Sequence, residues 1–320
     1  MRHKKVLFSS LVILFVAVLG TSIYAYLHVR GSQNSAPKPP QTVSRRAAPA
    51  PAATSASSVL AHVVIIVEEN KPKDTIVGNS AAPYLNSLMH TYAMAQNYYG
   101  VTHPSLPNYL ALTSGTFDGI TTDCNPPGGA CEANVKNIAD EIEQSGRTWK
   151  EYAESMPSPC YQYNSGEYAV KHNPFMYYPD ITSNPARCNS HVVPFSTFSK
   201  DLASTTSLPN YSFITPNLCN DMHNCSVQTG DQWLAKIVPA ILNSPGFTKQ
   251  RSLLAIVWDE GYVGNNNVLA ILAGSAVKKG YVSTAYYNHY SLLHTIEYLW
   301  GLSPLTANDR NAPLMTSMLN

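Results

Sequence analysis

The clearest pattern in the chain is a pair of hydrophobic runs, each followed by polar residues. Residues 61–67 (AHVVIIV) and 252–258 (SLLAIVW) are continuous and rich in aliphatic side chains. Such runs predict strands buried on both faces, as in the middle of a parallel sheet. Glu69 and Asn70 follow the first run, and Asp259 follows the second. Because ligands in open α/β sheets bind beyond the carboxyl ends of the strands, we expect these side chains to meet at one edge.

Weaker periodicities between the two runs predict helices and further strands. This alternation predicts an α/β fold with a mostly parallel central sheet and helices on both faces. Residues 116–205 are loop-rich and contain four of the six cysteines, so a disulfide-stapled insertion near the site is expected. The predicted helices cover 81–91, 108–113, 137–145, 233–242 and 290–300, and the further strands cover 210–215 and 268–273.

The N-terminal segment predicts export of the rest of the chain. A basic start (Arg2, Lys4, Lys5) precedes residues 6–27, an uncharged run of 22 residues. That length crosses a bilayer as a helix, with the basic flank in the cytoplasm. A cleaved signal peptide is the alternative. We therefore expect residues 1–27 to be a signal anchor or signal peptide and the protein to be extracytoplasmic, either membrane-anchored or secreted.

The following segment changes character before the first hydrophobic run. Residues 28–60 are rich in Pro, Ala and Ser, cannot bury a core, and predict an extended linker. The catalytic domain is then expected at 61–320. Its six cysteines would lie in an oxidising compartment, where disulfides form. Sequence proximity favours the pairs Cys124–Cys131, Cys160–Cys188 and Cys219–Cys225, and zinc binding by these cysteines is the alternative.

Charge argues against one class of partner. The formal net charge is +1 and only 13% of residues are charged. Binding to nucleic acid requires a concentrated basic face, and the body of the chain has no such cluster.

The polar residues after the two hydrophobic runs predict a metal site. Glu69, Asn70, Asp259 and Glu260 offer carboxylate and amide oxygens. Such ligands suit Mg²⁺, Ca²⁺ or Mn²⁺, and they are compatible with Zn²⁺. The alternative is that acidic residues merely end the strands.

Ser105 is the candidate nucleophile. It lies between two prolines in the stretch VTHPSLPNYLALTSG (101–115), directly before an apolar helical run. A hydroxyl there lies at a helix N-terminus, which favours an anion such as a phosphoryl group. The alternative is an ordinary N-cap serine.

Five motifs in order resemble one family. VVIIVEEN, THPSLPNYLALTSG, KHNPF, PNLCNDMHNC and WDEG are similar to motifs of the bacterial phosphoesterase family, which groups acid phosphatases with phospholipases C. The nucleophile segment also resembles that of the alkaline phosphatase superfamily, so the resemblance, which spans about 61–320, implies an alkaline-phosphatase-like fold. It implies that Ser105 attacks the phosphate and touches one divalent metal held by Glu69, Asn70, Asp259 and Glu260. A phosphoseryl intermediate would then be hydrolysed.

The resemblance extends the site to further polar residues. It implies that Asn108 holds a phosphate oxygen. We assign catalytic roles to His103, His172 and His223, which would bind phosphate or protonate the leaving group, and phosphate contacts to Asp221 and His289. In two-metal relatives an Asp and two histidines hold a second metal, a role open to Asp221, His223 and His289. His294, inside an apolar helix, is interpreted as structural.

These observations predict a metal-dependent hydrolase of small phosphate monoesters. A phospholipase C-like diesterase acting on phospholipid is the alternative within the family. A serine hydrolase would use Ser105, Asp259 and His289, but the G-x-S-x-G motif of α/β-hydrolases is absent from the sequence. A non-catalytic surface-binding protein would have no need for every motif residue.

Overall fold

The computed structural model describes residues 59–262 and 264–320. Within those residues an eight-stranded sheet has the order β4-β3-β5-β1-β6-β7-β2-β8. All neighbouring pairs are parallel except those of β7, which runs antiparallel to β6 and β2. The prediction of a mostly parallel sheet is therefore confirmed. The strands are β1 (His62–Glu68), β2 (Ala93–Tyr99), β3 (Trp149–Ala153), β4 (Val192–Pro194), β5 (Tyr211–Thr215), β6 (Ser252–Trp258), β7 (Asn267–Ala273) and β8 (Tyr281–Asn288).

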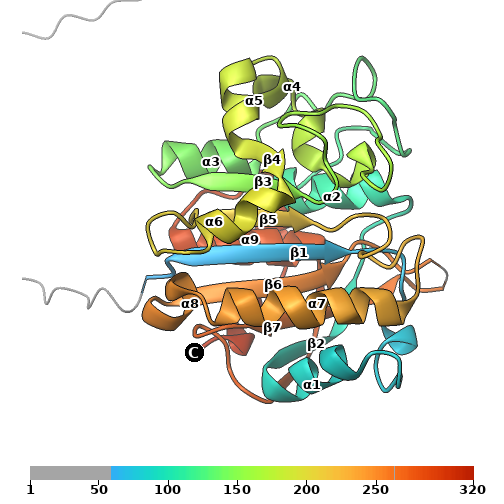
Figure 1. Cartoon of the computed structure of the whole chain (residues 1–320), viewed down its shortest axis with the longest axis vertical. Helices are drawn as coiled ribbons and strands as arrows, with labels where there is room; N and C mark the ends of the chain where they lie inside the picture. The colour runs from blue at the N-terminus through green and yellow to red at the C-terminus, as the bar shows by residue number, and fades with distance from the viewer. Residues whose placement is uncertain (1–58, 263) are drawn as a thin grey trace, which may run out of the picture. The chain divides into compact units, whose positions relative to one another are not determined.

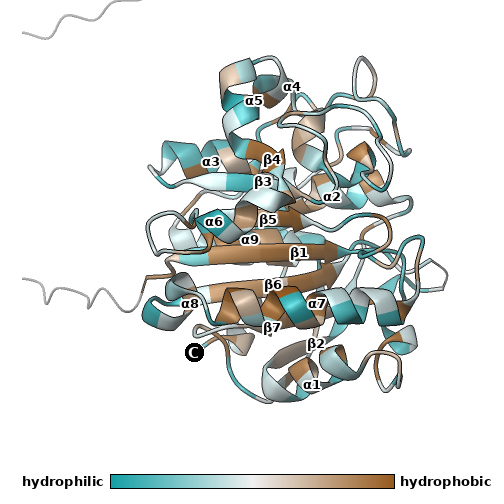
Figure 2. Ribbon diagram, in the orientation of Figure 1, coloured by the Kyte–Doolittle hydropathy of each residue, from teal (hydrophilic) through white to brown (hydrophobic). Residues whose placement is uncertain are grey.

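The two hydrophobic runs form the centre of this sheet. Every residue of β1 and β6 is buried, and the two strands pair in parallel from His62↔Ser252 to Glu68↔Trp258. Helices cover both faces: Figure 1 shows α7 (Val227–Leu242) in front of β6 and β7 and α9 (His289–Trp300) behind the sheet. Figure 2 shows that the most hydrophobic residues lie in these central strands, as burial on two faces requires.

The longer helices match the predicted ones, with shifted ends. α1 (Pro83–Thr91), α2 (Ser105–Ser114) and α3 (Ile138–Gln144) lie within three residues of the predicted bounds. α7 begins six residues before its predicted start, because Ser226 caps a polar first turn that has no apolar periodicity. Shorter helices are α4 (Pro179–Thr182), α5 (Pro185–His191), α6 (Phe198–Asp201), α8 (Pro245–Lys249) and α10 (Ala307–Asn311). Short 3₁₀ helices cover Lys73–Thr75, Val170–His172, Pro174–Tyr177, Phe195–Thr197 and Met315–Met318.

The region 116–205 is loop-rich, as predicted, but it also contributes to the sheet. Its strands β3 and β4 extend the sheet beyond β5. The three predicted disulfides are present, namely Cys124–Cys131, Cys160–Cys188 and Cys219–Cys225, and no described cysteine is free.

The predicted anchor or signal peptide at 1–27 lies outside the described residues, as does all of the predicted linker except its last two residues. Leu60 is already buried, and the Trp300 indole donates a hydrogen bond to its carbonyl. Within the described residues, no helix is both long enough and apolar enough to cross a bilayer.

Candidate active site

The two acidic clusters meet at the carboxyl edge of the sheet. Glu69 and Asp259 directly follow strands that lie side by side, so their side chains emerge together. The Asp259 N–H donates to the Glu68 carbonyl (2.9 Å), and the Asn70 N–H donates to Asp259 Oδ1 (3.1 Å). Asn70 adopts a left-handed conformation with φ of 53°, which asparagine tolerates better than most residues. The turn after β1 is thus folded onto the Asp259 carboxylate.

Ser105 faces this acidic edge from the first residue of α2. Its side chain is buried, and its Oγ donates to Glu69 Oε2 over 3.0 Å. The other oxygen of Glu69 accepts a hydrogen bond from the Tyr109 hydroxyl, one turn further along α2 (2.7 Å). One helix therefore supplies both hydroxyl groups that fix the Glu69 carboxylate.

Asn108 supports the loop before Ser105. Its Oδ1 accepts from the Val101 and Thr102 N–H groups, and its Nδ2 donates to the carbonyls of Thr102 and Pro104. The side chain is fully buried. All of its usual donor and acceptor capacity is used by residues 101–104, so in this structure Asn108 braces the loop before Ser105.

One N–H group of the first turn of α2 is already occupied. The Leu106 N–H donates to Asp123 Oδ1 (3.0 Å), and Pro107 has no N–H to offer. The other Asp123 oxygen accepts from Lys171 Nζ (2.7 Å). The sequence analysis identified neither Asp123 nor Lys171 as a site residue. The Lys171–His172 dipeptide was the available signal for the lysine, whereas Asp123 sits in an unpatterned loop beside Cys124.

His172 lies beneath the site between two acids. Its Nε2 is 3.2 Å from Glu69 Oε1, and its Nδ1 is 3.3 Å from Asp221 Oδ2. The ring stacks on Tyr109 with centroids 5.3 Å apart. Burial and the nearby Lys171 lower the pKa of His172. Its side chain is only 1% exposed, so the ring is buried between the two carboxylates.

Asp221 and His223 come from the short loop between Cys219 and Cys225, which a disulfide closes. Between them, Met222 adopts φ of 74° and packs against Gly230 of α7, where an added Cβ would approach its side chain to 2.5 Å. Asp221 accepts from the His223 N–H (2.7 Å), and its carbonyl accepts from the Glu69 N–H (2.8 Å). The loop is thereby fixed to the end of β1.

His103 and Glu260 form a pair at the rim of the site. Nδ1 of His103 lies 2.5 Å from Glu260 Oε2, with the imidazole about half exposed and the carboxylate buried. Burial and the charge of Asp123 raise the pKa of Glu260 to about 7. Glu260, predicted as a metal ligand, therefore turns its carboxylate towards a histidine, and its raised pKa leaves it partly protonated at neutral pH.

His289 lies behind Asp259. Its Nε2 contacts the Asp259 carbonyl (2.5 Å), and its Nδ1 contacts the Tyr98 hydroxyl (3.0 Å). Because a carbonyl only accepts, Nε2 carries the proton and Tyr98 donates to Nδ1. Burial lowers the pKa of His289 to about 4. Both ring nitrogens are occupied, so the structure does not place His289 with the groups that reach a phosphate or a second metal.

His294 Nδ1 donates a hydrogen bond to the Ala312 carbonyl (2.8 Å), away from these groups. This contact is consistent with the structural role that the sequence predicted.

The buried acids fit a cation. Burial and the charges of neighbouring acids raise the pKa of Glu69, and burial and Glu260 raise that of Asp259 to about 7. Asp259 Oδ2, Asp221 Oδ2 and His172 Nε2 are buried with no hydrogen-bond partner. Buried carboxylates require a proton or a compensating charge, and a divalent ion would supply that charge. Within the described part of the chain, ligand atoms of Glu69, His172 and His223 lie within 4.8 Å of one another. This donor set is richer in nitrogen than the predicted oxygen set.

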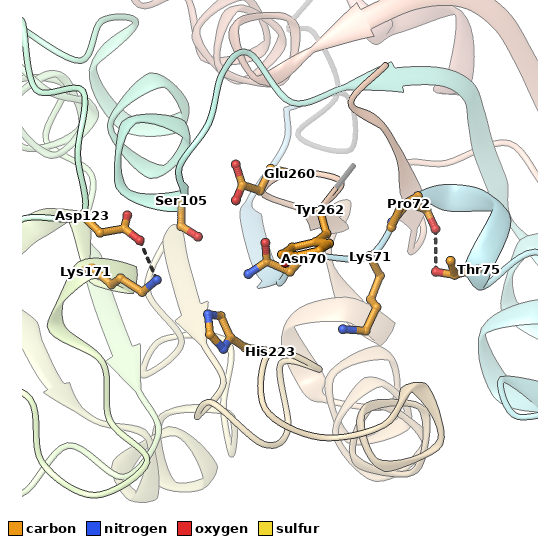
Figure 3. A pocket seen from close by; sticks show the side chains of 10 residues that line it. All are labelled: Asn70, Lys71, Pro72, Thr75, Ser105, Asp123, Lys171, His223, Glu260 and Tyr262. Carbon is orange, nitrogen blue, oxygen red and sulfur yellow. Dashed lines mark hydrogen bonds and ion pairs between the residues drawn. The ribbon is translucent and has the colours of Figure 1, made fainter. Parts of the chain in front are cut away.

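A pocket of about 600 Å³ opens above these groups (Figure 3). In this view Ser105 and Glu260 lie above His223. Asp123 and Lys171 lie next to Ser105. The lining residues are Asn70, Lys71, Pro72, Thr75, Ser105, Asp123, Lys171, His223, Glu260 and Tyr262.

Comparisons with known proteins agree with the family resemblance of the sequence motifs. The model of the Phosphoesterase family matches residues 78–303. The chain is 36% identical over 271 residues to a phosphatidylinositol-3-phosphatase of Mycobacterium tuberculosis, covering 83% of this chain and 85% of the relative. It is 33% identical over 236 residues to an acid phosphatase of Aspergillus fumigatus, covering 70% of this chain and 52% of that protein.

Solved structures show a shared fold at low identity. A member of the alkaline phosphatase superfamily from Vibrio parahaemolyticus superposes with a TM-score of 0.55 at 12% identity, covering 80% of this chain and 71% of the other. Murine ectonucleotide pyrophosphatase/phosphodiesterase 5 gives a TM-score of 0.53 at 10% identity, covering 81% of this chain and all of the other.

Proposed function

Because the chain belongs to the Phosphoesterase family and is a hydrolase acting on phosphoric esters, we propose that it hydrolyses phosphate monoesters with Ser105 as the nucleophile. The observation that carries the proposal is the hydrogen bond from Ser105 Oγ to Glu69 Oε2 at the floor of the pocket. A serine hydroxyl pointed at a buried carboxylate, beside cationic side chains, suits attack on a phosphoryl group.

Each side chain has a separate role in the proposed reaction. Ser105 Oγ forms a bond to phosphorus as the bond to the ester oxygen breaks, and the hydroxyl proton passes towards Glu69. Lys171 leaves its ion pair with Asp123 and neutralises charge on the phosphoryl oxygens. The leaving oxygen takes a proton from the His103–Glu260 pair, in which the pKa of Glu260 is raised to about 7. Water then displaces Ser105 Oγ from phosphorus, with the same pair accepting a proton of the water and the proton held at Glu69 returning to Ser105 Oγ.

A divalent metal completes the proposed site. Glu69, Asp259, His172 and His223 would hold it with Asn70 and Ser105 nearby, and Asp221 would orient His172. When bound, the ion lowers the pKa of the serine hydroxyl and offsets charge on the phosphate. Because the donors include imidazole as well as carboxylate, we propose Zn²⁺ or Mn²⁺ ahead of Mg²⁺ and Ca²⁺.

A phosphate monoester on a lipid headgroup is part of this substrate class. The relative from M. tuberculosis bears the name of a phosphatase for such a lipid. We also propose that the protein acts outside the cytoplasm, because its three disulfides require an oxidising compartment.

The decisive experiment compares p-nitrophenyl phosphate with bis(p-nitrophenyl) phosphate, with and without EDTA and added divalent metals. The monoester should be hydrolysed faster, and EDTA should abolish the activity reversibly. A faster diester reaction would instead support the phospholipase C-like alternative. Activity that survives EDTA would refute the metal.

Ser105→Ala tests the nucleophile. We expect kcat to fall by at least about 10³-fold, as losses of activated nucleophiles do, and acid quenching of the wild type to trap one phosphoryl group on Ser105 by mass spectrometry. Ser114→Ala is the matched control, since Ser114 lies on the same helix and bonds the Leu110 carbonyl. Equal kcat values for Ser105→Ala and the wild type would refute the role.

A further inference from the structure

Two lysines line the pocket, and only one of them has an acid within ion-pair distance. Lys171 lies beside Ser105 and is paired with Asp123 at 2.7 Å. Lys71 lies on the other side of the view, next to Pro72. Within the described ranges, 59–262 and 264–320, Lys71 takes part in no ion pair, and its Nζ makes one hydrogen bond, to the Met222 carbonyl (2.7 Å).

An ammonium group has three N–H donors, so this single bond leaves two for a ligand. The side chain is partly buried in the pocket wall, where solvent screens its charge less than at the open surface. By contrast, Lys73, two residues away, is absent from the pocket lining and donates to the Gln96 carbonyl at the surface. Lys71 therefore has two unused donors, and the acids that act on its charge, Asp221, Glu69 and Asp259, lie beyond ion-pair distance.

The pocket is also larger than the reaction needs. Its volume of about 600 Å³ is in the range of pockets that hold a drug-sized ligand, whereas a phosphoryl group beside Ser105 fills only the end near Asp123 and Lys171. The remaining wall carries Lys71, Thr75 and the exposed ring of Tyr262. A substrate that fills the pocket thus presents its distal part to Lys71.

We propose that Lys71 binds a second anionic group of the substrate, so that the preferred substrates are phosphate monoesters that carry another phosphate or phosphodiester on the same small polyol. This inference rests on the proposed function of Ser105. A bisphosphorylated soluble polyol and a phosphoinositide headgroup share this chemistry, and they differ in whether the second phosphate is attached to lipid.

The test measures phosphate release from myo-inositol 1,3-bisphosphate and from myo-inositol 3-phosphate by the full chain loaded with metal. The readout is the ratio of the two kcat/KM values. We expect the ratio to exceed one in the wild type, to fall about tenfold in Lys71→Gln, as loss of one charged hydrogen bond predicts, and to recover in Lys71→Arg. Lys73→Gln, the matched control, should keep the ratio of the wild type.

A second arm uses phosphatidylcholine vesicles containing phosphatidylinositol 3-phosphate. A loss in Lys71→Gln on the vesicles, on the soluble bisphosphate or on both supports the second-anion site and identifies its source. If Lys71→Gln reduces all substrates equally, the lysine merely holds the Met222 loop, and the inference is overturned while the proposed function stands. If the wild type releases no phosphate from any monoester, including p-nitrophenyl phosphate, both are refuted.

Discussion

At the scale of single residues, the site is organised by carboxylates that point at other protein groups. Glu69 receives hydrogen bonds from Ser105 and Tyr109, and Asp123 receives them from Leu106 and Lys171. Each carboxylate binds a proposed catalytic group (Ser105 or Lys171) through one oxygen. The other oxygen binds a supporting group (Tyr109 or Leu106). Substitutions that keep the geometry but change the charge therefore separate the two functions.

Asp123 offers such a separation. Asp123→Ala should lower the free energy of unfolding by about 1 kcal/mol, because the Leu106 N–H at the start of α2 loses its acceptor. Asp123→Asn keeps an acceptor for that N–H but removes the charge opposite Lys171, so it should keep most of the stability. Chemical denaturation measures both. Equal losses in the two variants would show that the ion pair, and not the cap, stabilises the helix.

Tyr98 tests the placement of His289. Tyr98→Phe removes the only described donor to His289 Nδ1 and leaves that nitrogen buried without a partner, which should cost about 1–3 kcal/mol of stability. Tyr286→Phe is the control, because that tyrosine is more than half exposed. An unchanged thermal midpoint in Tyr98→Phe would argue against the assigned tautomer.

At the scale of elements, α2 is held at both ends by distant parts of the chain. Asp123 caps its N-terminus, and at its C-terminus the Gly115 carbonyl accepts hydrogen bonds from Thr306 and Asn308. Gly115 has φ of 71°, and a Cβ there would meet Asp309 at 2.6 Å, so only glycine fits this junction. The position of Ser105 thus depends on the packing of α9 and α10.

That packing should depend on pH through Glu297 of α9. Burial and the neighbouring Asp309 raise the pKa of Glu297 from 4.5 to about 9. The folded protein then holds a proton that the unfolded chain releases above about pH 4.5, so stability is greatest below that pH and is lost as pH rises towards 9. Glu297→Gln should remove this loss, raising the free energy of unfolding at pH 8 by up to about 1.4 kcal/mol per pH unit crossed.

Denaturation curves at pH 5 and pH 8 measure the effect. The two proteins should converge at pH 5, and Glu167→Gln, which changes an exposed glutamate, should follow the wild type at both values. A stabilisation by Glu297→Gln that is the same at pH 5 and pH 8 would contradict the assigned cause.

Burial decides which strands of the sheet the sequence predicts. β1 and β6 are buried on both faces, so their side chains are uniformly hydrophobic and the runs predict them well. β8 is an edge strand with several exposed residues, and its sequence YVSTAYYN has no apolar run, so it was not predicted. β2 was also not predicted, because its sequence AMAQNYY is polar in the middle and has no continuous apolar run.

The same limit applies to the site. The sequence placed Glu69, Ser105 and Asp259 together because each follows or begins an element with a readable pattern. It could not show that Asn108 and His289 use their polar atoms on the backbone and on Tyr98. Those contacts depend on loop paths, which no periodicity encodes.

At the scale of the whole molecule, the disulfides allow stability and activity to be separated. Replacing Cys219 and Cys225 by serine opens a short loop and should cost about 2.5 kcal/mol, whereas opening the longer Cys160–Cys188 loop should cost about 3.5 kcal/mol. Activity should fall more when the Cys219–Cys225 loop is opened, because Asp221 and His223 lie inside that loop. Thermal denaturation and phosphatase assays measure the two rankings. A larger loss of activity on opening Cys160–Cys188 would contradict the role of the Cys219–Cys225 loop.

Metal binding should also stabilise the whole fold. Glu69, Asp221 and Asp259 are buried acids with raised pKa values, so a bound divalent ion relieves their repulsion. At a concentration one hundred times its dissociation constant, the ion should add about 2.7 kcal/mol to the free energy of unfolding. Scanning calorimetry with EDTA and with each metal measures this shift and ranks the ions. A thermal midpoint that no divalent metal raises would contradict the site.

The pairing of β1 with β6 also sets when activity can begin during synthesis. The two strands are neighbours in the sheet, but His62 and its partner Ser252 are 190 residues apart in the chain. At about 5–20 residues per second, roughly 10–40 s separate the synthesis of Glu69 from that of Asp259. During that interval the nucleophile segment already exists without half of its acids. The proposed hydrolysis needs both Glu69 and Asp259, so it would start only after nearly the whole domain has been made.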